Sequence, residues 1–363
     1  MDKIKIRTAV IGAGKVADIH ASILAIQPGS EFIAVCSRTS ERAEALAKRY
    51  GVKAYTVIPT MIQEMGVEAV VVCTPHPAHA ASAIQAIEHG VHVLVEKPLA
   101  ASLADCDALI AAAERHRAKL GVISQRRWYA PAQRVKTAID SGKIGKPILG
   151  TVTLFGWRDQ AYYASDLWRG RWETEGGGVL VNQAPHQLDL LLWYMGEVDE
   201  LFGYWANLNH PYIEVEDTAL AIVRFKSGAL GNIVLSNSQN PGLYGNVHMF
   251  GENGGAIGVQ TDGGSMFIAG MTSVQEPPFN DLWTIAGEEK LLSQWQEADR
   301  ALFAAIDPIK HYFALQIEDF LDAIRDDRNP AVTAIEGRRV VELFTAIYRS
   351  QQRREPVQFP LDS

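Results

Sequence analysis

The sequence predicts a two-domain protein in which an α/β domain with a doubly wound parallel sheet precedes an α+β domain with a large, mostly antiparallel open sheet. The length of 363 residues exceeds that of one ordinary domain. Over the first third of the chain, apolar strand segments alternate with helical ones, which indicates parallel strands joined by right-handed crossovers. After Arg126 the strand segments follow one another directly. We therefore expect residues 1–125 to form the first domain and residues 126–363 the second.

The first domain is read from apolar runs separated by turn residues. Ala69 to Cys73 are five apolar residues in a row, which is typical of a strand covered on both faces. Ser102 is placed to cap the helix that follows it. The expected strands are 4–11, 31–36, one near Ala54, 69–73, 91–95 and 120–123; the expected helices are 16–26, 41–50, one near Met61, 78–88 and 103–116.

The second domain begins with a connecting helix and continues as a sheet. Its clearest element is a hairpin, in which strands 218–225 and 229–236 flank a Lys-Ser-Gly turn. The glycine-rich segment 251–255 marks another turn. The expected elements are helix 131–141, a sheet spanning 148–270, helix 182–195, an amphipathic helix 309–324 stopped by Asn329-Pro330, and a final helix 336–351.

Composition and charge exclude several classes of partner. Apolar residues make up 47% and charged residues 21% of the chain, as in ordinary globular proteins. The net charge is -8, and the 34 Lys and Arg residues form no basic tract that could neutralise phosphates, so we expect no nucleic-acid partner. A small anionic substrate stays open, because a local site can oppose the global charge.

Cysteine usage and hydropathy point to a reducing compartment. The three cysteines, Cys36, Cys73 and Cys106, are far apart, and no pair has the spacing of metal ligands, so we expect neither a metal site nor a disulfide framework. The N-terminal residues lack the apolar region of a signal peptide. No apolar run approaches the roughly 20 residues of a membrane helix. We expect a cytoplasmic protein without a membrane partner.

A glycine loop connects the first strand to the first helix. In this G-x-G-x-x-A segment, Gly12 permits a tight turn, Gly14 lets the backbone approach a pyrophosphate, and Ala17 is small enough for helix packing. The helix N-terminus, at Lys15 and Val16, offers free N–H groups to phosphate. Such a loop can serve the fold alone, but the strand before it and the helix after it favour a dinucleotide-binding Rossmann domain.

The end of the second strand bears on the choice between NAD and NADP. NAD-binding domains usually carry an acid there that holds the ribose 2′-hydroxyl. This chain has Cys36-Ser37-Arg38-Thr39 without a carboxylate. Ser37 and Arg38 suit a 2′-phosphate, although Arg38 stacking beside adenine would tolerate either cofactor. We expect NAD or NADP, with a slight preference for NADP.

A lysine follows the fifth strand in the segment Glu96-Lys97-Pro98. At the carboxyl end of a parallel strand, Lys97 would point into the crevice where ligands bind. A surface lysine before a turn proline has the same composition, so this segment alone decides nothing.

Several further segments occur in a fixed order and together carry a resemblance. They are the glycine loop, Cys73-Thr74-Pro75 with His79, Glu96-Lys97-Pro98, Arg127 with Pro131, Gly142-Lys143-Ile144-Gly145, and Gly176-Gly177-Gly178 leading to His186 and Asp189. In these features the chain resembles the Gfo/Idh/MocA family of oxidoreductases over nearly its whole length.

The resemblance implies a nicotinamide cofactor and a division of roles. Lys97 would contact the reacting hydroxyl and the nicotinamide, and the bond to Pro98 would often be cis. The second domain would present an open antiparallel sheet, often used in dimer or tetramer contacts, so a homodimer or homotetramer is expected. The cofactor-binding set would add Thr74, Pro75, His79, Glu96 and Lys97 to the glycine loop, Ser37 and Arg38.

Asn182, His186, Asp189 and Trp193 share one face of the expected helix 182–195. Taken alone, His186 reads as a core histidine satisfied by Asp189. The resemblance reverses that preference, because His186 matches the histidine that works with the lysine as acid and base.

Asn182 departs from many sugar and inositol dehydrogenases of the family, which carry aspartate there. Asparagine cannot take a proton, but it can orient a hydroxyl by hydrogen bonds. The proton must then pass through His186 or Lys97. An Asn-Gln pair also occurs in members that act on sugar nucleotides or glycosides.

Aromatic and arginine side chains gather just before the glycine run. Aromatic faces stack on sugar rings, and arginines bind hydroxyls or carboxylates. We expect Arg127, Trp157, Trp168 and Arg169 to line the substrate pocket, while about half of such aromatic residues would pack the core.

These features predict an NAD(P)-dependent dehydrogenase or reductase acting on a secondary alcohol or ketone of a sugar, glycoside, sugar nucleotide or inositol that binds between the domains. Two alternatives stay open. One is a glycoside hydrolase that oxidises its sugar transiently with bound NAD+. The other is a nucleotide-sensing regulator without catalysis, against which the presence of both Lys97 and His186 argues.

Overall fold

The computed structural model describes residues 4–261 and 277–362, and the chain divides into two compact units. The first contains residues up to 125 together with 309–341. The second contains residues 126–308 and 342–362. The division after residue 125 lies where the sequence places it, but segment 309–341, expected in the second domain, packs with the first unit.

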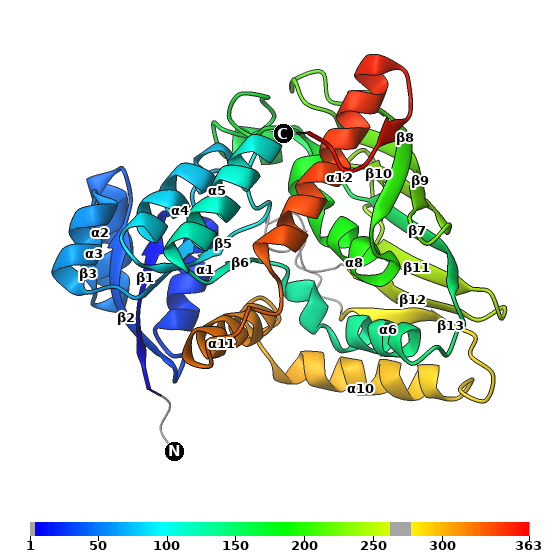
Figure 1. Ribbon diagram of the computed structural model, residues 1–363, viewed down its shortest axis with the longest axis horizontal. Helices are drawn as coiled ribbons and strands as arrows, with labels where there is room; N and C mark the ends of the chain where they lie inside the picture. Colours follow the sequence, from blue (N-terminus) through cyan, green and yellow to red (C-terminus); the bar gives the residue numbers. More distant parts are fainter. Residues whose placement is uncertain (1–3, 262–276, 363) are drawn as a thin grey trace. The chain divides into compact units, whose positions relative to one another are not determined.

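Six parallel strands form the sheet of the first unit in the described chain, in the order β3-β2-β1-β4-β5-β6 (Figure 1). This is the doubly wound order of a Rossmann domain, with its switch point between β1 and β4. The strands are β1 (Ile6–Ile11), β2 (Ser30–Cys36), β3 (Lys53–Tyr55), β4 (Ala69–Val72), β5 (His92–Val95) and β6 (Leu120–Val122). The helices are α1 (Lys15–Leu24), α2 (Ser40–Tyr50), α3 (Ile58–Met65), α4 (His79–Glu88), α5 (Leu103–His116) and α11 (His311–Arg325), with a 3-10 turn at His76–Ala78.

The core of this unit explains why α11 belongs to it. The strands β1 and β4 are almost wholly buried, as their apolar runs predict. Phe313, Ile317, Phe320 and Leu321 of α11 join the same core as residues of α1 and β1. The spacing of these four residues puts them on one face of the helix, which matches the amphipathic pattern predicted for 309–324.

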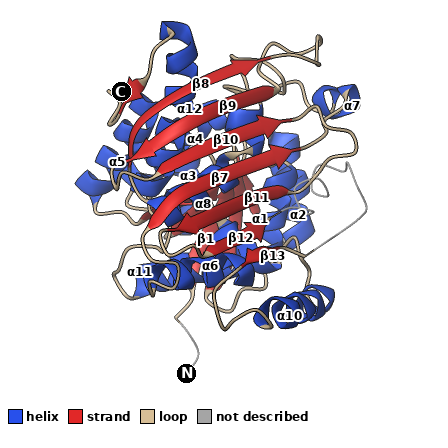
Figure 2. Ribbon diagram, turned by 90° about the vertical axis from the view of Figure 1, so that its right-hand side faces the viewer, coloured by secondary structure: helices blue, strands red, loops and turns tan. Residues whose placement is uncertain are grey.

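The second unit is built on an eight-stranded sheet among the described residues, in the order β13-β12-β11-β7-β10-β9-β8-β14. Its neighbours pair antiparallel except for β7 and β10, which are parallel. Figure 2 shows this sheet nearly face on, with α8 behind β7 and β11. The strands are β7 (Pro147–Phe155), β8 (Val198–Ala206), β9 (Thr218–Phe225), β10 (Leu230–Ser236), β11 (Gly245–Gly251), β12 (Ala256–Gln260), β13 (Phe279–Trp283) and β14 (Val357–Gln358).

The predicted fold class is confirmed: one unit contains a parallel sheet and the other a mostly antiparallel sheet. Strand β9 alternates buried and exposed residues, which indicates one covered and one open face. The hairpin β9–β10 has the register expected from the Lys-Ser-Gly turn. The expected sheet range 148–270 was too short at its end, since β13 follows it, and residues 262–270 lie outside the described part.

The expected helix 182–195 is wrong at its N-terminus. A π-helical turn occupies Val179–Gln183, and α8 covers Pro185–Met195. Proline lacks an N–H group and therefore favours the first turn of a helix, so Pro185 fixes the start of α8. Asn182 consequently lies in the turn before α8 and not on the helical face of His186. The remaining helices of this unit are α6 (Ala130–Asp140), α7 (Gln160–Ala164) and α10 (Leu291–Ala305), and the division of the chain falls within α12 (Ala334–Arg353).

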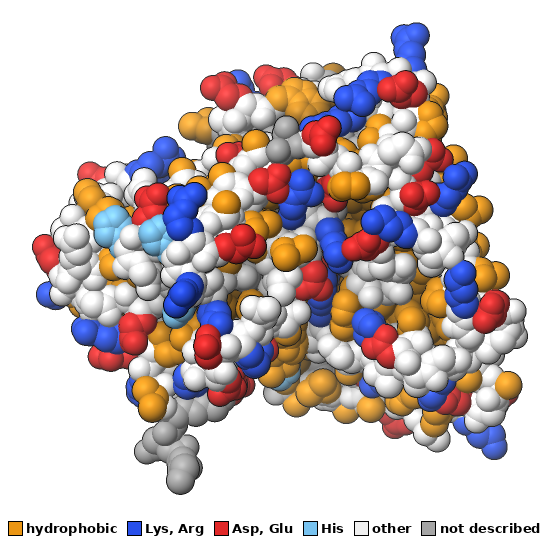
Figure 3. Space-filling view, in the orientation of Figure 1, with side chains coloured by type: hydrophobic (Ala, Val, Ile, Leu, Met, Phe, Trp, Pro, Cys, Tyr) orange, Lys and Arg blue, Asp and Glu red, His pale blue; other side chains and the backbone are white. Residues whose placement is uncertain are grey.

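Charged side chains of both signs are interspersed on the face shown in Figure 3. Within the described ranges, no helix combines the length and apolar character that crossing a bilayer requires.

Candidate active site

The glycine loop follows β1 at the carboxyl edge of the parallel sheet. Gly12 has a φ of +115°, and a Cβ atom there would lie 2.6 Å from the carbonyl oxygen of Cys73, which follows β4. Only glycine permits both this backbone conformation and this close approach. The tight turn expected at Gly12 is therefore required by the neighbouring strand as well as by any ligand.

Gly14 leaves an open position at the start of α1. It is the N-cap residue, its backbone is extended, and among the described residues no heavy atom beyond its chain neighbours and the adjoining helix backbone lies within 4 Å of where its Cβ would be. No side chain caps this helix end, so the N–H groups of its first turn, including those of Lys15 and Val16, are open to an anion. The residues present thus fit the pyrophosphate of a dinucleotide.

Ser37 and Arg38 follow β2 at the same edge of the sheet. The Ser37 N–H group donates to the carbonyl oxygen of Tyr55 at 3.0 Å, which fixes the end of the strand. The Arg38 side chain is exposed. A guanidinium in place of the usual carboxylate can accept either ribose form of the cofactor.

Glu96, the residue before Lys97, forms a buried ion pair with a histidine. Glu96 is 7% exposed, and its Oε1 atom is 2.7 Å from Nε2 of His20 on α1. Its Oε2 atom accepts a hydrogen bond from the Lys97 N–H group at 3.0 Å. Burial alone would raise the pKa of Glu96, but the bond and charge of His20 and the charge of Lys97 hold it below its ordinary value. Glu96, expected to bind cofactor, thus holds the backbone of Lys97.

His79 joins the two loops that follow β4 and β5. Its Nδ1 atom is 2.8 Å from the Pro98 carbonyl oxygen, and its Nε2 atom is 2.8 Å from that of Thr74. The side chain is 1% exposed, and burial lowers its pKa. His79 therefore places Thr74 and exposed Pro75, while the Lys97–Pro98 bond is cis, as the resemblance implies.

In the second unit, the first turn of α8 carries His186, which is buried with 7% exposure. One turn further, the Asp189 carboxylate accepts hydrogen bonds from Nε and Nη2 of Arg127 at 2.8 and 2.7 Å. The Arg127 guanidinium also lies 5.1 Å from the ring centre of Trp193. Arg127, expected to bind substrate, is a buried partner of Asp189, and it anchors the helix of His186.

Tyr162 on α7, which is not among the residues predicted from the sequence, is the centre of a second group of polar side chains. Its hydroxyl lies 3.1 Å from Nε2 of Gln183 and 3.4 Å from Nδ2 of Asn182, and it accepts a bond from Nη1 of Arg169. The Arg169 guanidinium lies 4.3 Å from the Tyr162 ring centre and 4.4 Å from that of Trp168. Two of the expected substrate residues, Arg169 and Asn182, thus contact one tyrosine, and Arg169 also contacts a third, Trp168.

A neighbouring carboxylate explains the asparagine at position 182. Glu175 is 1% exposed, and its Oε1 atom accepts a hydrogen bond from Nδ2 of Asn182. An aspartate at 182 would place two carboxylates against each other, and one would then have to be protonated. The amide avoids this repulsion. The sequence offered two acids between Trp172 and the glycine run, Glu173 and Glu175, and did not indicate which of them faces Asn182.

Glu216 fixes the turn that carries Asn182. The carboxylate accepts N–H bonds from Gly178, at 3.0 and 2.9 Å, and from Leu180, at 3.0 Å. A Cβ at Gly178 would lie 1.8 Å from the Glu216 carbonyl oxygen, so this approach requires glycine. Burial raises the pKa of Glu216 to about 7, against the opposing effect of the N–H bonds.

Trp157 lies apart from the Tyr162 group. It follows β7 and is bridged to Ser238, and its ring centre is 5.9 Å from that of His210. No group of three or more potential metal ligands occurs in the described ranges.

The parallel sheet with its open glycine loop defines the class: this is a protein with a dinucleotide-binding Rossmann domain. A profile described as "Oxidoreductase family, NAD-binding Rossmann fold" matches residues 6–124, and one described as "GFO/IDH/MocA C-terminal domain" matches residues 132–257. The chain belongs to the Gfo/Idh/MocA family of NAD-binding oxidoreductases.

Full-length relatives share this arrangement. The scyllo-inositol 2-dehydrogenase (NAD(+)) of Bacillus subtilis is 27% identical, covering 98% of this chain and 96% of the relative. The myo-inositol 2-dehydrogenase of Thermotoga maritima is also 27% identical, covering 97% and 98%. The WlbA dehydrogenase of Bordetella pertussis, solved with NADH and UDP-GlcNAcA, has a TM-score of 0.82 at 30% identity, covering 99% and 100%. The protein is therefore an NAD(P)-dependent oxidoreductase, and its relatives act on sugars, inositols and sugar nucleotides.

Proposed function

We propose that this protein is a dehydrogenase that oxidises a secondary alcohol of a carbohydrate or polyol, or reduces the corresponding ketone. The observation that carries the proposal is the carboxyl edge of the parallel sheet. There the open glycine loop, which fits a dinucleotide pyrophosphate, and Lys97, held by its N–H bond to Glu96, follow strands of one sheet. Ligands of doubly wound sheets bind along this edge.

Lys97 acts as a cation that donates to the substrate oxygen. The charge of buried Glu96 attracts the Lys97 ammonium group, as the lowered pKa of Glu96 reflects. Lys97 therefore polarises and orients the hydroxyl rather than removing its proton.

His186 is the group that takes the proton. Neutral imidazole is a suitable base near neutral pH. Arg127 and Asp189 hold the helix that carries it. The nicotinamide cofactor, when bound, supplies the acceptor for the hydride. Asn182 and Gln183 orient the neighbouring hydroxyls of the substrate, and Tyr162 and Arg169 lie beside them. We call these four residues the substrate-contact group.

We favour a sugar nucleotide or glycoside over a free inositol as the substrate. The support is the Asn182–Gln183 pair, which suits members acting on sugar nucleotides, and the similarity to two WlbA dehydrogenases solved with NADH and UDP-GlcNAcA. The second of these, from Chromobacterium violaceum, has a TM-score of 0.83 at 28% identity, covering 100% of this chain and 99% of that one.

For the cofactor, we propose a slight preference for NADP+ through Arg38. The support is the exposed guanidinium at the end of β2 and the lack of a carboxylate from Cys36 to Thr39. Replacing Arg38 by Ala should raise KM for NADP+ about tenfold, the value of one charge-assisted hydrogen bond, and leave KM for NAD+ nearly unchanged. Equal effects on the two cofactors would contradict the preference.

The open face of the second unit's sheet supports a homodimer or homotetramer. Tyr204, Leu220, Ile222 and Leu230 are 47–66% exposed on β8, β9 and β10. Contiguous exposed apolar side chains of this kind mark interaction surfaces. Light scattering of the wild type and of an Ile222→Glu variant measures the assembly, which the charge should dissociate.

The catalytic assignment is tested with a panel of sugars, sugar nucleotides and inositols. Wild type should reduce NAD+ or NADP+ with at least one of them. Lys97→Met and His186→Ala should each lower kcat/KM at least about 100-fold, the usual value of a positioned proton-transfer group. Unchanged turnover in both variants would sink the assignment.

The same assay separates the alternative functions. Release of an aglycone without net nucleotide reduction indicates a hydrolase, and nucleotide binding without turnover of any substrate indicates a regulator.

A further inference from the structure

The connection between β8 and β9, residues 207–217, forms hydrogen bonds at three separate places with the segments that carry the substrate-contact group. His210 contacts the carbonyl oxygen of Arg158 at 2.7 Å. The Glu214 N–H group donates to the carbonyl oxygen of Gly170 at 2.8 Å. Glu216 binds the N–H groups of the turn that carries Asn182. A single loop thus positions both segments from which the substrate residues come.

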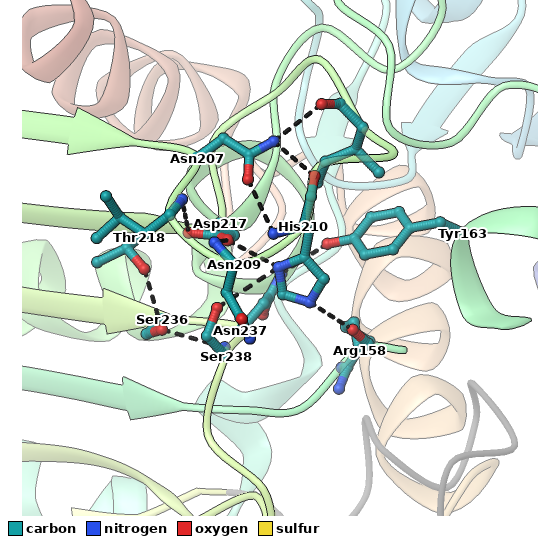
Figure 4. Close-up of polar contacts among 12 residues, drawn as sticks. Arg158, Tyr163, Asn207, Asn209, His210, Asp217, Thr218, Ser236, Asn237 and Ser238 are labelled. Carbon is teal, nitrogen blue, oxygen red and sulfur yellow. Dashed lines mark hydrogen bonds and ion pairs between the residues drawn. The ribbon is translucent and has the colours of Figure 1, made fainter. Parts of the chain in front are cut away.

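His210 holds one of these attachments through a buried ion pair (Figure 4). Its Nδ1 atom lies 2.7 Å from Oδ2 of Asp217, and neither side chain is exposed. Asp217 also accepts N–H bonds from Leu208 at 3.1 Å and Asn209 at 2.8 Å, so it closes the loop. Burial by itself would raise the pKa of Asp217, but these bonds hold it well below its ordinary value.

Both ring nitrogens of His210 face acceptor oxygens. Nδ1 faces the Asp217 carboxylate and Nε2 faces the Arg158 carbonyl. An imidazole donates at both nitrogens only when it is protonated. The rings of Trp157, Tyr163 and Tyr212 lie 5.6–5.9 Å from its ring and exclude water, which strengthens the two bonds.

A chain of contacts connects Arg158, which His210 binds, with the expected substrate residues Asn182 and Gln183. The Arg158 guanidinium lies 5.2 Å from the ring centre of Tyr162, whose hydroxyl contacts Asn182 and Gln183. A parallel route runs through Asn237, which is 3.4 Å from the Tyr163 hydroxyl and donates to Oε1 of Gln183 at 2.9 Å. Displacement of Arg158 would therefore move both amides.

We propose that His210, as an imidazolium, is a positioning residue for substrate binding. Its ring binds both Asp217 and the Arg158 carbonyl group, and Arg158 in turn contacts Tyr162 of the substrate-contact group. The inference rests on the proposed function, because it assumes that Asn182 and Gln183 contact the substrate. It adds a specificity-determining residue that touches neither substrate nor cofactor.

Steady-state kinetics of His210→Gln test the proposal. We expect KM for the sugar substrate to rise about tenfold, as for loss of a hydrogen bond to a charged group, while KM for the nicotinamide nucleotide stays unchanged. His248→Gln is the matched control, because His248 forms a similar pair with Asp281 at 2.7 Å on β11 and should behave as wild type.

Two outcomes would overturn the proposal: His210→Gln matching the control, or both KM values rising together. If His210→Gln does not fold, Asp217→Asn, which keeps an acceptor oxygen but removes the charge, should also raise KM for the sugar substrate and leave KM for the nucleotide unchanged. An unchanged substrate KM in that variant also contradicts the proposal.

A measurement independent of turnover separates this proposal from the proposed function. Nitrogen-15 spectra of the histidine side chains should show protons on both nitrogens of His210 at neutral pH, assigned by loss of the signal in His210→Gln. A neutral single tautomer would overturn the imidazolium whatever the substrate proves to be. If His210 is an imidazolium but the protein oxidises no sugar, the result contradicts the proposed function and leaves the protonation of His210 standing.

Discussion

At the scale of single residues, Gly12 and Gly14 serve different purposes although they belong to one loop. Gly12 combines a φ of +115° with a close approach to the Cys73 carbonyl group, so the fold itself requires it. Gly14 has ordinary extended backbone and an open Cβ position. Its small size therefore matters only when a ligand approaches.

This difference gives a paired prediction. Gly12→Ala should lower the free energy of unfolding by about 1–3 kcal/mol, because the added Cβ is strained and collides with Cys73. Gly14→Ala should leave stability within about 0.5 kcal/mol and weaken dinucleotide binding. Urea unfolding and fluorescence titration with NADH measure the two effects. Equal destabilisation by both substitutions would contradict the distinction.

The partners of individual buried side chains could not be predicted from the sequence. The pattern selected Lys97, His186 and Asn182 as candidates, but it could not show that Glu96 binds His20, or that Arg127 binds Asp189. Both pairs join residues more than 60 positions apart. Such partners are set by tertiary packing, and local spacing carries no information about them.

At the scale of elements, the π-helical turn before α8 depends on one carboxylate. Glu216 accepts the N–H groups of Gly178 and Leu180, which the turn leaves without helical partners. Periodicity predicted one helix from 182 to 195, because both the turn and α8 are apolar on the buried side. Only the position of Pro185 in the sequence indicated a later start.

Glu216 makes the stability of this protein pH-dependent. Its pKa rises from 4.5 to about 7 in the folded protein, so the folded state binds a proton that the unfolded state has lost. The free energy of unfolding should therefore fall by up to about 3 kcal/mol as the pH rises from 4.5 to 7, and this part should then stay level.

A Glu216→Gln variant isolates the effect. The amide keeps an acceptor oxygen for the N–H groups but does not titrate, so this decline should be absent from the variant and should appear in the difference between wild type and variant. Urea unfolding at intervals from pH 4.5 to 8 measures it. A constant difference across that range would show that the Glu216 carboxyl titrates as in the unfolded chain.

At the scale of the whole molecule, the doubly wound parallel sheet followed from the sequence, but the membership of α11 did not. Alternating strands and helices predict a parallel sheet, and the switch point then follows from chain order. The amphipathic face of 309–324 was visible as well. Which sheet it covers was not, because an apolar stripe specifies burial without specifying the partner.

The packing of α11 implies that residues 1–125 do not form an independent domain. Phe313, Ile317, Phe320 and Leu321 are each at most 5% exposed in the first unit's core, and burial of each contributes about 1.5–3 kcal/mol. Their sum is comparable to the whole stability of a typical domain. Gln316 adds polar contacts, donating to the Val122 carbonyl oxygen at 2.8 Å and accepting from the Ser124 N–H group at 2.9 Å.

A fragment of residues 1–125 should therefore lack a cooperative urea transition and should not bind NADH. Joining residues 309–341 to it through a flexible linker should restore both. The matched control is the same joined chain carrying Phe320→Ala, which should unfold about 3–5 kcal/mol more easily, because Phe320 is 2% exposed. Circular dichroism in urea reports the transition and NADH fluorescence reports binding. A cooperative, NADH-binding 1–125 fragment would show instead that the parallel sheet completes its core without α11, and that the boundary expected from the sequence is sufficient for folding.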